Sequence, residues 1–288
     1  MDLRALAMGV AFALMWSSAF ASARIIVADA PPLTALALRF LISGGLGIAI
    51  ALLLGQSARL TAAQWRATVL FGICQNALYL GFTFVALQTV EASLAAVIAS
   101  TMPLIGAAAG WGLLGQRLPW HGVFGLVAGF AGVVLILGDR ISGGADPLGL
   151  LFCGLGITAL AFATLALRNT SSGGNVLMVV GLQMLVGAAA LAPVALLLET
   201  PEVRWSAPLV AAFVYTTLVP GLAATWVWFV LVRRIGAVRA ATFHFLNPFL
   251  GVAIAALLLG ERLGPLDIAG VAVVMAGILA VQLASRPG

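Results

Sequence analysis

Charged side chains are scarce in this chain. Only 8% of its 288 residues are Asp, Glu, Lys or Arg, and all fourteen basic residues are arginine. A soluble domain carries roughly 25% charged residues and about 45–50% apolar ones, whereas 63% of this chain is hydrophobic and its mean hydropathy is +1.17. Only lipid can act as the solvent for so much apolar surface. The composition therefore excludes a soluble domain and predicts an integral membrane protein.

Cysteine and histidine are also rare. Cys74 and Cys153 lie inside apolar stretches without the spacing of a metal site or a disulfide framework, so we interpret both as packing residues. His121 and His244 lie in different parts of the chain, and no H-E-x-x-H, G-x-S-x-G or P-loop motif occurs. The sequence thus predicts no catalytic residues, no metal site and no cofactor, and it indicates a protein that is not an enzyme.

Long apolar runs divide the chain into ten segments, each near the length of about 20 residues that a membrane-spanning helix needs. The first segment resembles a secretory signal peptide, because one arginine precedes an apolar run that ends in small residues. It is long enough to span a membrane, and we expect it to be retained. The fold class predicted is all-α, with ten transmembrane helices and no inserted soluble domain. The predicted spans are 3–22, 32–54, 65–87, 92–114, 120–138, 147–167, 175–198, 208–231, 237–259 and 265–284.

Arginine placement predicts the orientation, since the cytoplasmic loops of membrane proteins carry an excess of positive charge. If the N-terminus is cytoplasmic, most loop arginines face the cytoplasm, so we predict that both termini are cytoplasmic. Arg233 and Arg234 are the only adjacent pair, and such sparse charge does not form the cluster that binds nucleic acid. The inward-facing residues are Arg4, Arg59, Arg66, Arg117, Arg168, Arg233, Arg234, Arg239 and Arg286, and the outward-facing ones are Arg24, Arg140, Arg204 and Arg262.

The second half of the chain repeats features of the first at a constant shift of 145 residues. The shift superimposes Pro103 on Pro248 and aligns LLGQRL (113–118) with LLGERL (258–263). One shift that holds across two helices and their loop indicates a duplication. Because each half has five spans, an odd number, the second repeat must be inverted relative to the first, as in many secondary transporters. The predicted five-helix repeats are residues 1–143 and 144–288.

Three short motifs are distinctive: WSSAF at 16–20, LRF at 38–40 and the proline followed by LLG-[QE]-R-L in both halves. They resemble the EamA family of the drug/metabolite transporter superfamily. The resemblance covers essentially the whole chain, which looks most like the aromatic and neutral amino-acid exporters. It implies export of a small-molecule metabolite, such as an amino acid, across the bacterial inner membrane by a multi-pass protein that can act as a monomer in the lipid bilayer. A proton-coupled exporter of another metabolite or drug, and a non-transport receptor or assembly factor, are the alternatives.

Polar and aromatic residues inside apolar spans predict a substrate path, because such residues face the bundle interior or a cavity. Gln75, Tyr79 and Phe82 share one helix face by their spacing, and so do His244 and Asn247. Stacking surface with a few hydrogen-bonding groups suits an amphipathic small molecule, although interhelical packing would also explain these residues. The predicted path-lining residues are Trp16, Ser17, Gln75, Asn76, Tyr79, Phe82, Trp226, Phe243, His244 and Asn247.

Pro103 and Pro248 lie at equivalent places well inside the predicted fourth and ninth spans. A proline removes one backbone hydrogen bond and kinks a helix. We interpret the pair as hinges at which both helices bend beside a shared cavity during alternating access of the two halves. A static kink that only helps packing is the alternative.

Arg39 is the only charged residue well within a predicted span. It is either a counter-ion for a substrate carboxylate or a structural arginine that reaches the interface or holds backbone carbonyls. The resemblance places an arginine here in a family with varied substrates, which favours the structural role. No Asp or Glu lies in the middle of a span, where proton-driven transporters carry relay carboxylates. A lone histidine such as His244 is more often a packing residue than a proton carrier, so we expect facilitated diffusion.

Overall fold

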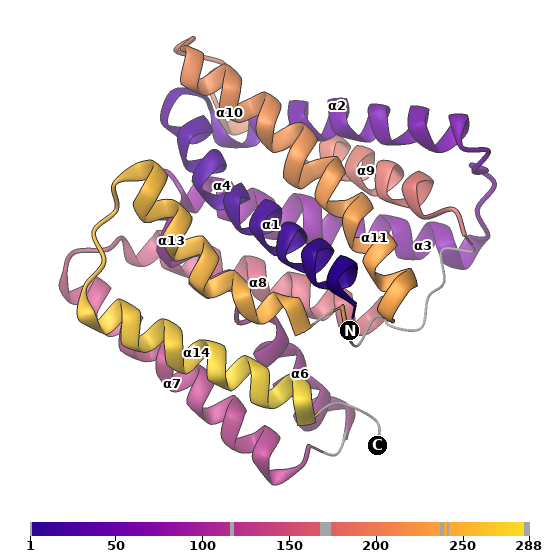
Figure 1. The fold of residues 1–288 in the computed structure, drawn as a ribbon. Helices are drawn as coiled ribbons and strands as arrows, with labels where there is room; N and C mark the ends of the chain where they lie inside the picture. The colour runs from indigo at the N-terminus through magenta and orange to yellow at the C-terminus, as the bar shows by residue number, and fades with distance from the viewer. Residues whose placement is uncertain (1, 116–117, 168–173, 237–238, 241, 285–288) are drawn as a thin grey trace. The chain divides into compact units, whose positions relative to one another are not determined.

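A computed structural model describes residues 2–115, 118–167, 174–236, 239–240 and 242–284 (Figure 1). Within these ranges every regular element is a helix, and ten helices are long and apolar enough to cross a membrane. The predicted all-α membrane fold is thereby confirmed. Arg117, Arg168 and Arg286, three of the arginines used to predict the orientation, lie outside the described residues.

Six helical elements and one π-helix make up the first four spans, and α7 forms the fifth. The elements are α1 (Leu3–Asp29), α2 (Pro32–Leu53), α3 (Ala62–Phe71), the π-helix η1 (Gly72–Leu80), α4 (Gly81–Ala86), α5 (Ala92–Ala99), α6 (Met102–Leu114) and α7 (Trp120–Ser142). The second half contains α8 (Pro147–Leu167), α9 (Val176–Leu198), α10 (Ala207–Leu218), the π-helix η2 (Val219–Ala223), α11 (Ala224–Ile235), the 3-10 helix η3 (Thr242–Leu246), α13 (Asn247–Leu259) and α14 (Pro265–Ala284).

Helix α1 is longer than the predicted first span, which ends at residue 22. The prediction ends there because Arg24 follows, and a charge within lipid is costly. In the structure, Arg24 Nη1 donates to the backbone carbonyl of Leu87 at the end of the third span. This hydrogen bond gives one guanidinium N–H group a partner within the protein, and α1 continues past Arg24 to Asp29.

Turn and capping residues mark the helix ends. Helix α3 begins with a capping box, in which Thr61 Oγ1 accepts from the Gln64 backbone N–H and Gln64 Oε1 accepts from the Thr61 N–H. Helices α6 and α13 both end at a glycine in the left-handed region, Gly115 with φ +62° and Gly260 with φ +68°. These two glycines are separated by the same shift of 145 residues that relates the two halves of the sequence.

Four spans are interrupted, and they form two equivalent pairs. The third and eighth spans each contain a π-helix, and the shift of 145 residues places Gln75 of η1 at the position of Pro220 in η2. The fourth span is broken between α5 and α6, and the ninth begins with a 3-10 helix before α13. Both kinds of interruption therefore occur once in each half of the chain.

The chain forms two compact units, and each contains segments of both halves. The first, here the α7–α14 unit, consists of Met1–Ala21, Thr89–Leu151 and Ala223–Gly288; the second, the α2–α9 unit, consists of Ser22–Gln88 and Phe152–Leu222. Helix α7 packs along α14 and α5 along α13 in the first unit, and α2 packs along α9 in the second (Figure 1). The shift makes α7 equivalent to α14 and α2 equivalent to α9, and it makes the fourth span, which contains α5, equivalent to the ninth, which contains α13. The boundaries of the repeats at 143 and 144 stay a prediction.

Candidate functional site

Four aromatic side chains gather in the α7–α14 unit. Phe12 and Trp16, one helical turn apart on α1, lie with Trp228 of α11 around the imidazole of His244 in η3. The ring centroids of Phe12, Trp16 and Trp228 lie 5.3, 6.3 and 5.1 Å from that of His244, and the rings of Phe12 and Trp16 meet it edge-on at 85° and 90°. Such edge-to-face arrangements are favourable for aromatic pairs. We call these four residues the His244 cluster.

A short series of hydrogen bonds orients the His244 ring. The amide Nδ2 of Asn247 lies 3.0 Å from His244 Nδ1. An amide nitrogen can only donate, so Nδ1 accepts and the proton of the neutral imidazole resides on Nε2. Ser17 Oγ lies 3.5 Å from both Oδ1 and the backbone oxygen of Asn247, and its one hydrogen can be donated to either. The predicted path-lining residues Trp16, Ser17, His244 and Asn247 are thus brought together, with one uncharged N–H donor among aromatic faces.

Phe243 lies in an apolar group against which Trp228 also packs. It is buried and packs with Ala5, Leu231 and Ala240. Its ring lies so close to α1 that a Cβ on Gly9 would come within 2.2 Å of it. The structure therefore gives Phe243 a packing contact between α1 and η3, although its position as a path-lining residue stays a prediction.

Sequence reasoning selected Trp226 and missed Phe12 and Trp228. Trp226 is 57% exposed on α11, while Trp228, two residues later, contacts His244. Residues two apart on a helix face opposite ways, so the choice depends on the helix phase, and η2 shifts that phase by its wider turn. Phe12 could have been found, since it precedes Trp16 by four residues on one helix face.

The remaining path-lining candidates lie on η1 and α4, in the α2–α9 unit. Asn76 Nδ2 donates to the backbone carbonyl of Gln183 at 2.8 Å, and Tyr79 is 3% exposed. Phe82 stacks on Phe152 with centroids 5.5 Å apart. Gln75 is half-buried. The prediction that Gln75, Tyr79 and Phe82 share a face assumes 3.6 residues per turn. The i→i+5 bonding of the π-helix η1 changes the angle between successive residues, so this spacing no longer places them on one face.

The structure corrects the placement of the two prolines. The sequence places both well inside continuous helices, whereas Pro103 lies in the first turn of α6 and Pro248 in the first turn of α13. A proline in the first turn costs no helical hydrogen bond. The interruptions precede the prolines, so each proline starts a helix after the interruption rather than kinking an unbroken one.

Hydroxyl groups also bond to the backbone at the first of these interruptions. Ser100 Oγ donates to the carbonyl of Ala96 at 2.7 Å, and Thr101 Oγ1 donates to that of Ile98 at 2.6 Å. Both carbonyls also accept backbone N–H groups, that of Ala96 from Ser100 and that of Ile98 from Thr101. The hydroxyls therefore add a second hydrogen bond to carbonyls that already have one.

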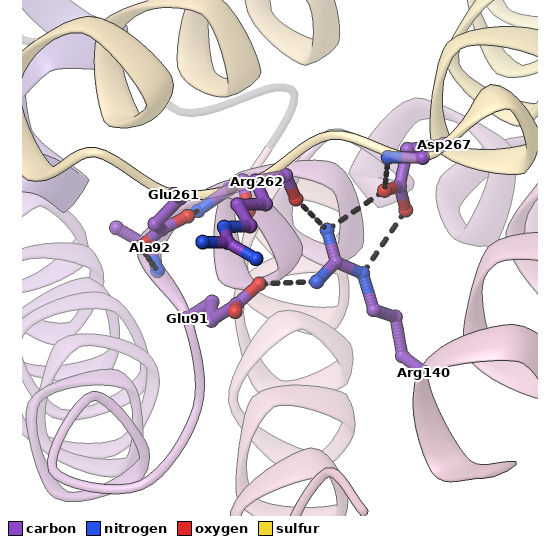
Figure 2. Close-up of polar contacts among 8 residues, drawn as sticks. Glu91, Ala92, Arg140, Glu261, Arg262 and Asp267 are labelled. Atoms are coloured by element: carbon purple, nitrogen blue, oxygen red, sulfur yellow. Dashed lines mark hydrogen bonds and ion pairs between the residues drawn. The ribbon is translucent and has the colours of Figure 1, made fainter. Parts of the chain in front are cut away.

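A polar network ties α7, α14 and the start of α5 together at one end of the α7–α14 unit (Figure 2). Arg140 Nε and Nη2 donate to the two carboxylate oxygens of Asp267 at 3.0 and 2.8 Å, and Arg140 Nη1 donates to Glu91 Oε2 at 2.5 Å. The carboxylate of Glu261 accepts from the backbone N–H groups of Ala92 and Ser93, at 2.7 and 2.9 Å. An acidic group at a helix N-terminus is favourable.

The α2–α9 unit has a matching arrangement. Glu199, which follows α9, accepts from the N–H groups of Leu33 and Thr34 at the start of α2, at 2.7 and 2.8 Å. Each unit thus has a helix whose N-terminus is held by a glutamate that follows another span.

The described residues hold no group of three or more His, Cys, Asp or Glu side chains that could bind a metal ion. Cys74 and Cys153 are both free and buried. Within the described spans, acidic residues occur only in terminal turns: Asp29 and Asp139 at the ends of α1 and α7, and Asp267 in the first turn of α14.

Comparison with known proteins gives a consistent result. The sequence profile described as the EamA-like transporter family matches residues 3–138 and again residues 147–283. The uncharacterized transporter YvbV of Bacillus subtilis is 26% identical over 95% of this chain and 90% of its own length. The uncharacterized inner membrane transporter YedA of Escherichia coli is 27% identical over 96% of this chain and 90% of its own length. Protein PecM of Dickeya dadantii is 25% identical over 91% and 86%.

A solved crystal structure shares the fold. It covers 99% of both chains at 24% sequence identity, with a TM-score of 0.71. The double match of one family profile agrees with a duplicated chain, and the curated relatives that carry a functional name are named as transporters.

Proposed function

Because the chain belongs to the EamA-like transporter family, we propose that it exports amino acids or similar small metabolites across the bacterial inner membrane. The substrate proposed is an aromatic or neutral amino acid, with both protein termini in the cytoplasm. The observation that carries the proposal is the His244 cluster. Three aromatic rings surround one oriented imidazole, and apolar walls with a few placed polar groups are typical of small-molecule sites.

The proposed mechanism is facilitated diffusion by alternating access of the two inverted halves. Two features support diffusion without proton coupling. Acidic residues in the described spans occupy only terminal turns, so no mid-span relay carboxylate is present there. His244 Nδ1 is engaged by Asn247, which favours the neutral ring. The interruptions before Pro103 and Pro248 are the places where the fourth and ninth spans would bend.

The test is flux into proteoliposomes that contain the purified full-length protein. Labelled phenylalanine, threonine and a polyamine are compared, with and without an imposed pH gradient. We expect saturable entry of phenylalanine or threonine that the gradient does not change. Flux that requires the gradient would favour the proton-coupled alternative, and absence of amino-acid flux would contradict the proposed substrate.

A matched pair of variants connects the flux to the site. Trp228→Ala removes a ring from the His244 cluster, whereas Trp226→Ala removes the same side chain two residues away, where it is 57% exposed. The first should reduce flux strongly, since an aromatic contact contributes about 0.5–1.5 kcal/mol beyond its buried area. The second should leave flux near the wild-type rate.

A further inference from the structure

Arg39 is a buried cation that has no anionic partner in the part of the chain that the structure describes. It lies on α2 in the α2–α9 unit and is 5% exposed. Its Nε is buried and has no hydrogen-bond partner, and no ion pair among the described residues includes it. A buried charge without a partner is strongly unfavourable. A protein that keeps such a charge within a span usually does so for function.

The surroundings of the guanidinium are neutral. Its Nη2 lies beside the η2 π-helix, 3.6 Å from the point where a Cβ on Gly221 would stand. Its Cζ lies 5.3 Å from the ring centre of Phe40. Ser43 Oγ donates to the backbone carbonyl of Arg39, which is a contact of the Arg39 main chain and not of its guanidinium. A structural arginine would be expected to hold carbonyls or an acid, and the described contacts of this side chain include neither.

The hydroxyls near Gly221 are also engaged. Thr216, whose carbonyl lies 3.2 Å from the Gly221 Cβ position, donates its Oγ1 hydrogen to the carbonyl of Ala212 at 2.6 Å. Thr217 Oγ1 donates to the carbonyl of Phe213 at 2.7 Å. A hydroxyl that donates its hydrogen can still accept from an N–H group, but it is uncharged, so these hydroxyls cannot neutralise a cation.

The place where Arg39 of α2 meets Gly221 of η2 is here called the corner. The duplication supplies a second version of this corner for comparison. The shift of 145 residues places Met184 at the position of Arg39 and Asn76 at the position of Gly221. In that version Asn76 donates to the carbonyl of Gln183, and a Cβ on Gly187 would lie 2.4 Å from the Asn76 Cβ. That corner is neutral, filled and hydrogen-bonded. A charge is therefore not required for packing a second-span helix against a π-helix in this fold.

We propose that Arg39 binds the carboxylate of the transported solute. The guanidinium N–H groups donate to the two carboxylate oxygens in the paired geometry that arginine favours. Gly221 places no side chain beside the guanidinium, whereas the equivalent position carries the Asn76 side chain. This assignment rests on the proposed function, because it names a carboxylate-bearing solute as the substrate class. It also gives Arg39 a role in binding in place of the structural role that the resemblance favours.

The test compares melting temperatures of the full-length protein in lipid nanodiscs. Phenylacetate and phenylalanine carry a carboxylate, whereas phenethylamine does not, and sodium phosphate represents inorganic phosphate and lipid headgroups. A ligand that binds only the folded state raises the melting temperature. We expect phenylacetate and phenylalanine to stabilise the wild type and phenethylamine and phosphate to have no effect. Equal stabilisation by phosphate would overturn a site for the solute carboxylate.

The variant Arg39→Met distinguishes binding from structure by the sign of its effect. Removing an unpaired buried charge is neutral or stabilising when an apolar side chain of similar size replaces it. We expect the ligand-free variant to melt at or above the wild-type temperature and to lose the response to phenylacetate, while Arg39→Lys keeps part of it. A variant that melts below the wild type and still responds to phenylacetate would refute the proposal.

Arg204→Met is the matched control, since the Arg204 side chain is 80% exposed in the same unit. It should keep the full response to phenylacetate. The outcome is separable from that of the flux experiment. If phenylalanine does not enter proteoliposomes but phenylacetate stabilises the wild type and not Arg39→Met, the proposed transport of amino acids fails and the carboxylate site stands.

Discussion

The carbonyl oxygen of Gly125 on α7 lies 2.6 Å from the point where a Cβ on Gly277 of α14 would stand. The reciprocal contact also occurs, because a Cβ on Gly132 would lie 2.9 Å from the carbonyl oxygen of Gly270. The shift of 145 residues converts Gly125 into Gly270 and Gly132 into Gly277. Exchanging the two halves therefore turns the Gly125–Gly277 contact into the Gly270–Gly132 contact. A pair of contacts that exchange in this way indicates that the two helices are related by a two-fold axis. The α7–α14 contact thus has the symmetry that inverted repeats require.

Gly277→Ala should destabilise this helix pair. The new Cβ would meet the Gly129 Cα at 2.5 Å and the Gly125 carbonyl at 2.6 Å, and backbone atoms cannot move aside as a side-chain end can. We expect a loss of about 1–3 kcal/mol, typical of overpacking, measured by thermal unfolding in detergent. The control is Gly138→Ala on α7, where a Cβ would meet nothing within 4 Å among the described residues. Equal stability of Gly277→Ala and the wild type would contradict the close approach.

Removing one partner of the Arg140–Asp267 pair should cost more than removing both. Their side chains are only 17% and 5% exposed, and an unpaired buried charge costs about 3–5 kcal/mol. Arg140→Gln should lower stability strongly, and the double variant Arg140→Gln/Asp267→Asn should recover part of the loss. A double-mutant cycle of unfolding free energies measures this coupling.

The exposed pair Arg204–Asp29 provides the control for that cycle. Arg204 is 80% exposed, so Arg204→Gln should change stability by less than about 1 kcal/mol. If Arg140→Gln is equally mild, the network in Figure 2 does not stabilise the end of this unit.

We expect the stability of the protein to depend on pH through Asp146, which lies in the α7–α8 connection. The hydrogen bond from Thr89 Oγ1, at 2.7 Å, holds the pKa of this carboxyl below its usual value, with help from the backbone N–H groups of Leu148 and Gly149. A carboxyl whose pKa is lower in the folded state stabilises the fold above its unfolded-state pKa, and that contribution is lost as the pH falls through the folded-state pKa. The wild type should therefore melt above Asp146→Asn at pH 7, and the two should converge in strong acid.

The convergence is measured as the difference in melting temperature between the two proteins from pH 7 down to pH 3. A difference that stays constant over the whole range would mean that the ionised form of Asp146 makes no special contribution.

The interruptions before Pro103 and Pro248 should matter for movement more than for folding. Pro103→Ala or Pro248→Ala would restore a backbone N–H in the first turn of α6 or α13 and allow the helix to extend across the break. We expect folded yield to be preserved and the transport rate to fall about tenfold, which corresponds to about 1.4 kcal/mol in the barrier. Pro193→Ala is the control, since Pro193 is exposed in the interior of α9. Normal transport by both variants would contradict the hinge.

The sequence predicts the spans well, because length and hydropathy determine them directly. It fails where a tertiary contact replaces a local rule. Helix α1 continues past Arg24, whose guanidinium donates to the carbonyl of Leu87. Local hydropathy cannot indicate a contact between residues so far apart in the sequence. A proline can either begin a helix or kink one. The sequence around Pro103 therefore does not show whether the helix is interrupted before the proline or bends at it.

Sequence spacing brings together some residues of the candidate site but not others. Spacing on one helix identified His244 with Asn247, because i, i+3 neighbours face the same way. It could not choose between Trp226 and Trp228, since that choice depends on the phase of α11 after η2. The neutral surroundings of Arg39 come from α2 and η2, which are far apart in the sequence, so only the structure reveals that this cation forms no ion pair with the described residues.

The measurement that tests the account most directly is exchange across proteoliposomes. Labelled phenylalanine is supplied outside, and the vesicles contain either unlabelled phenylalanine or buffer alone, with no pH gradient. A carrier that alternates between two states should take up label faster into preloaded vesicles, and Trp228→Ala should reduce this exchange while Trp226→Ala leaves it unchanged. Uptake no faster than in protein-free liposomes, or uptake equally reduced in both variants, would contradict transport through the His244 cluster.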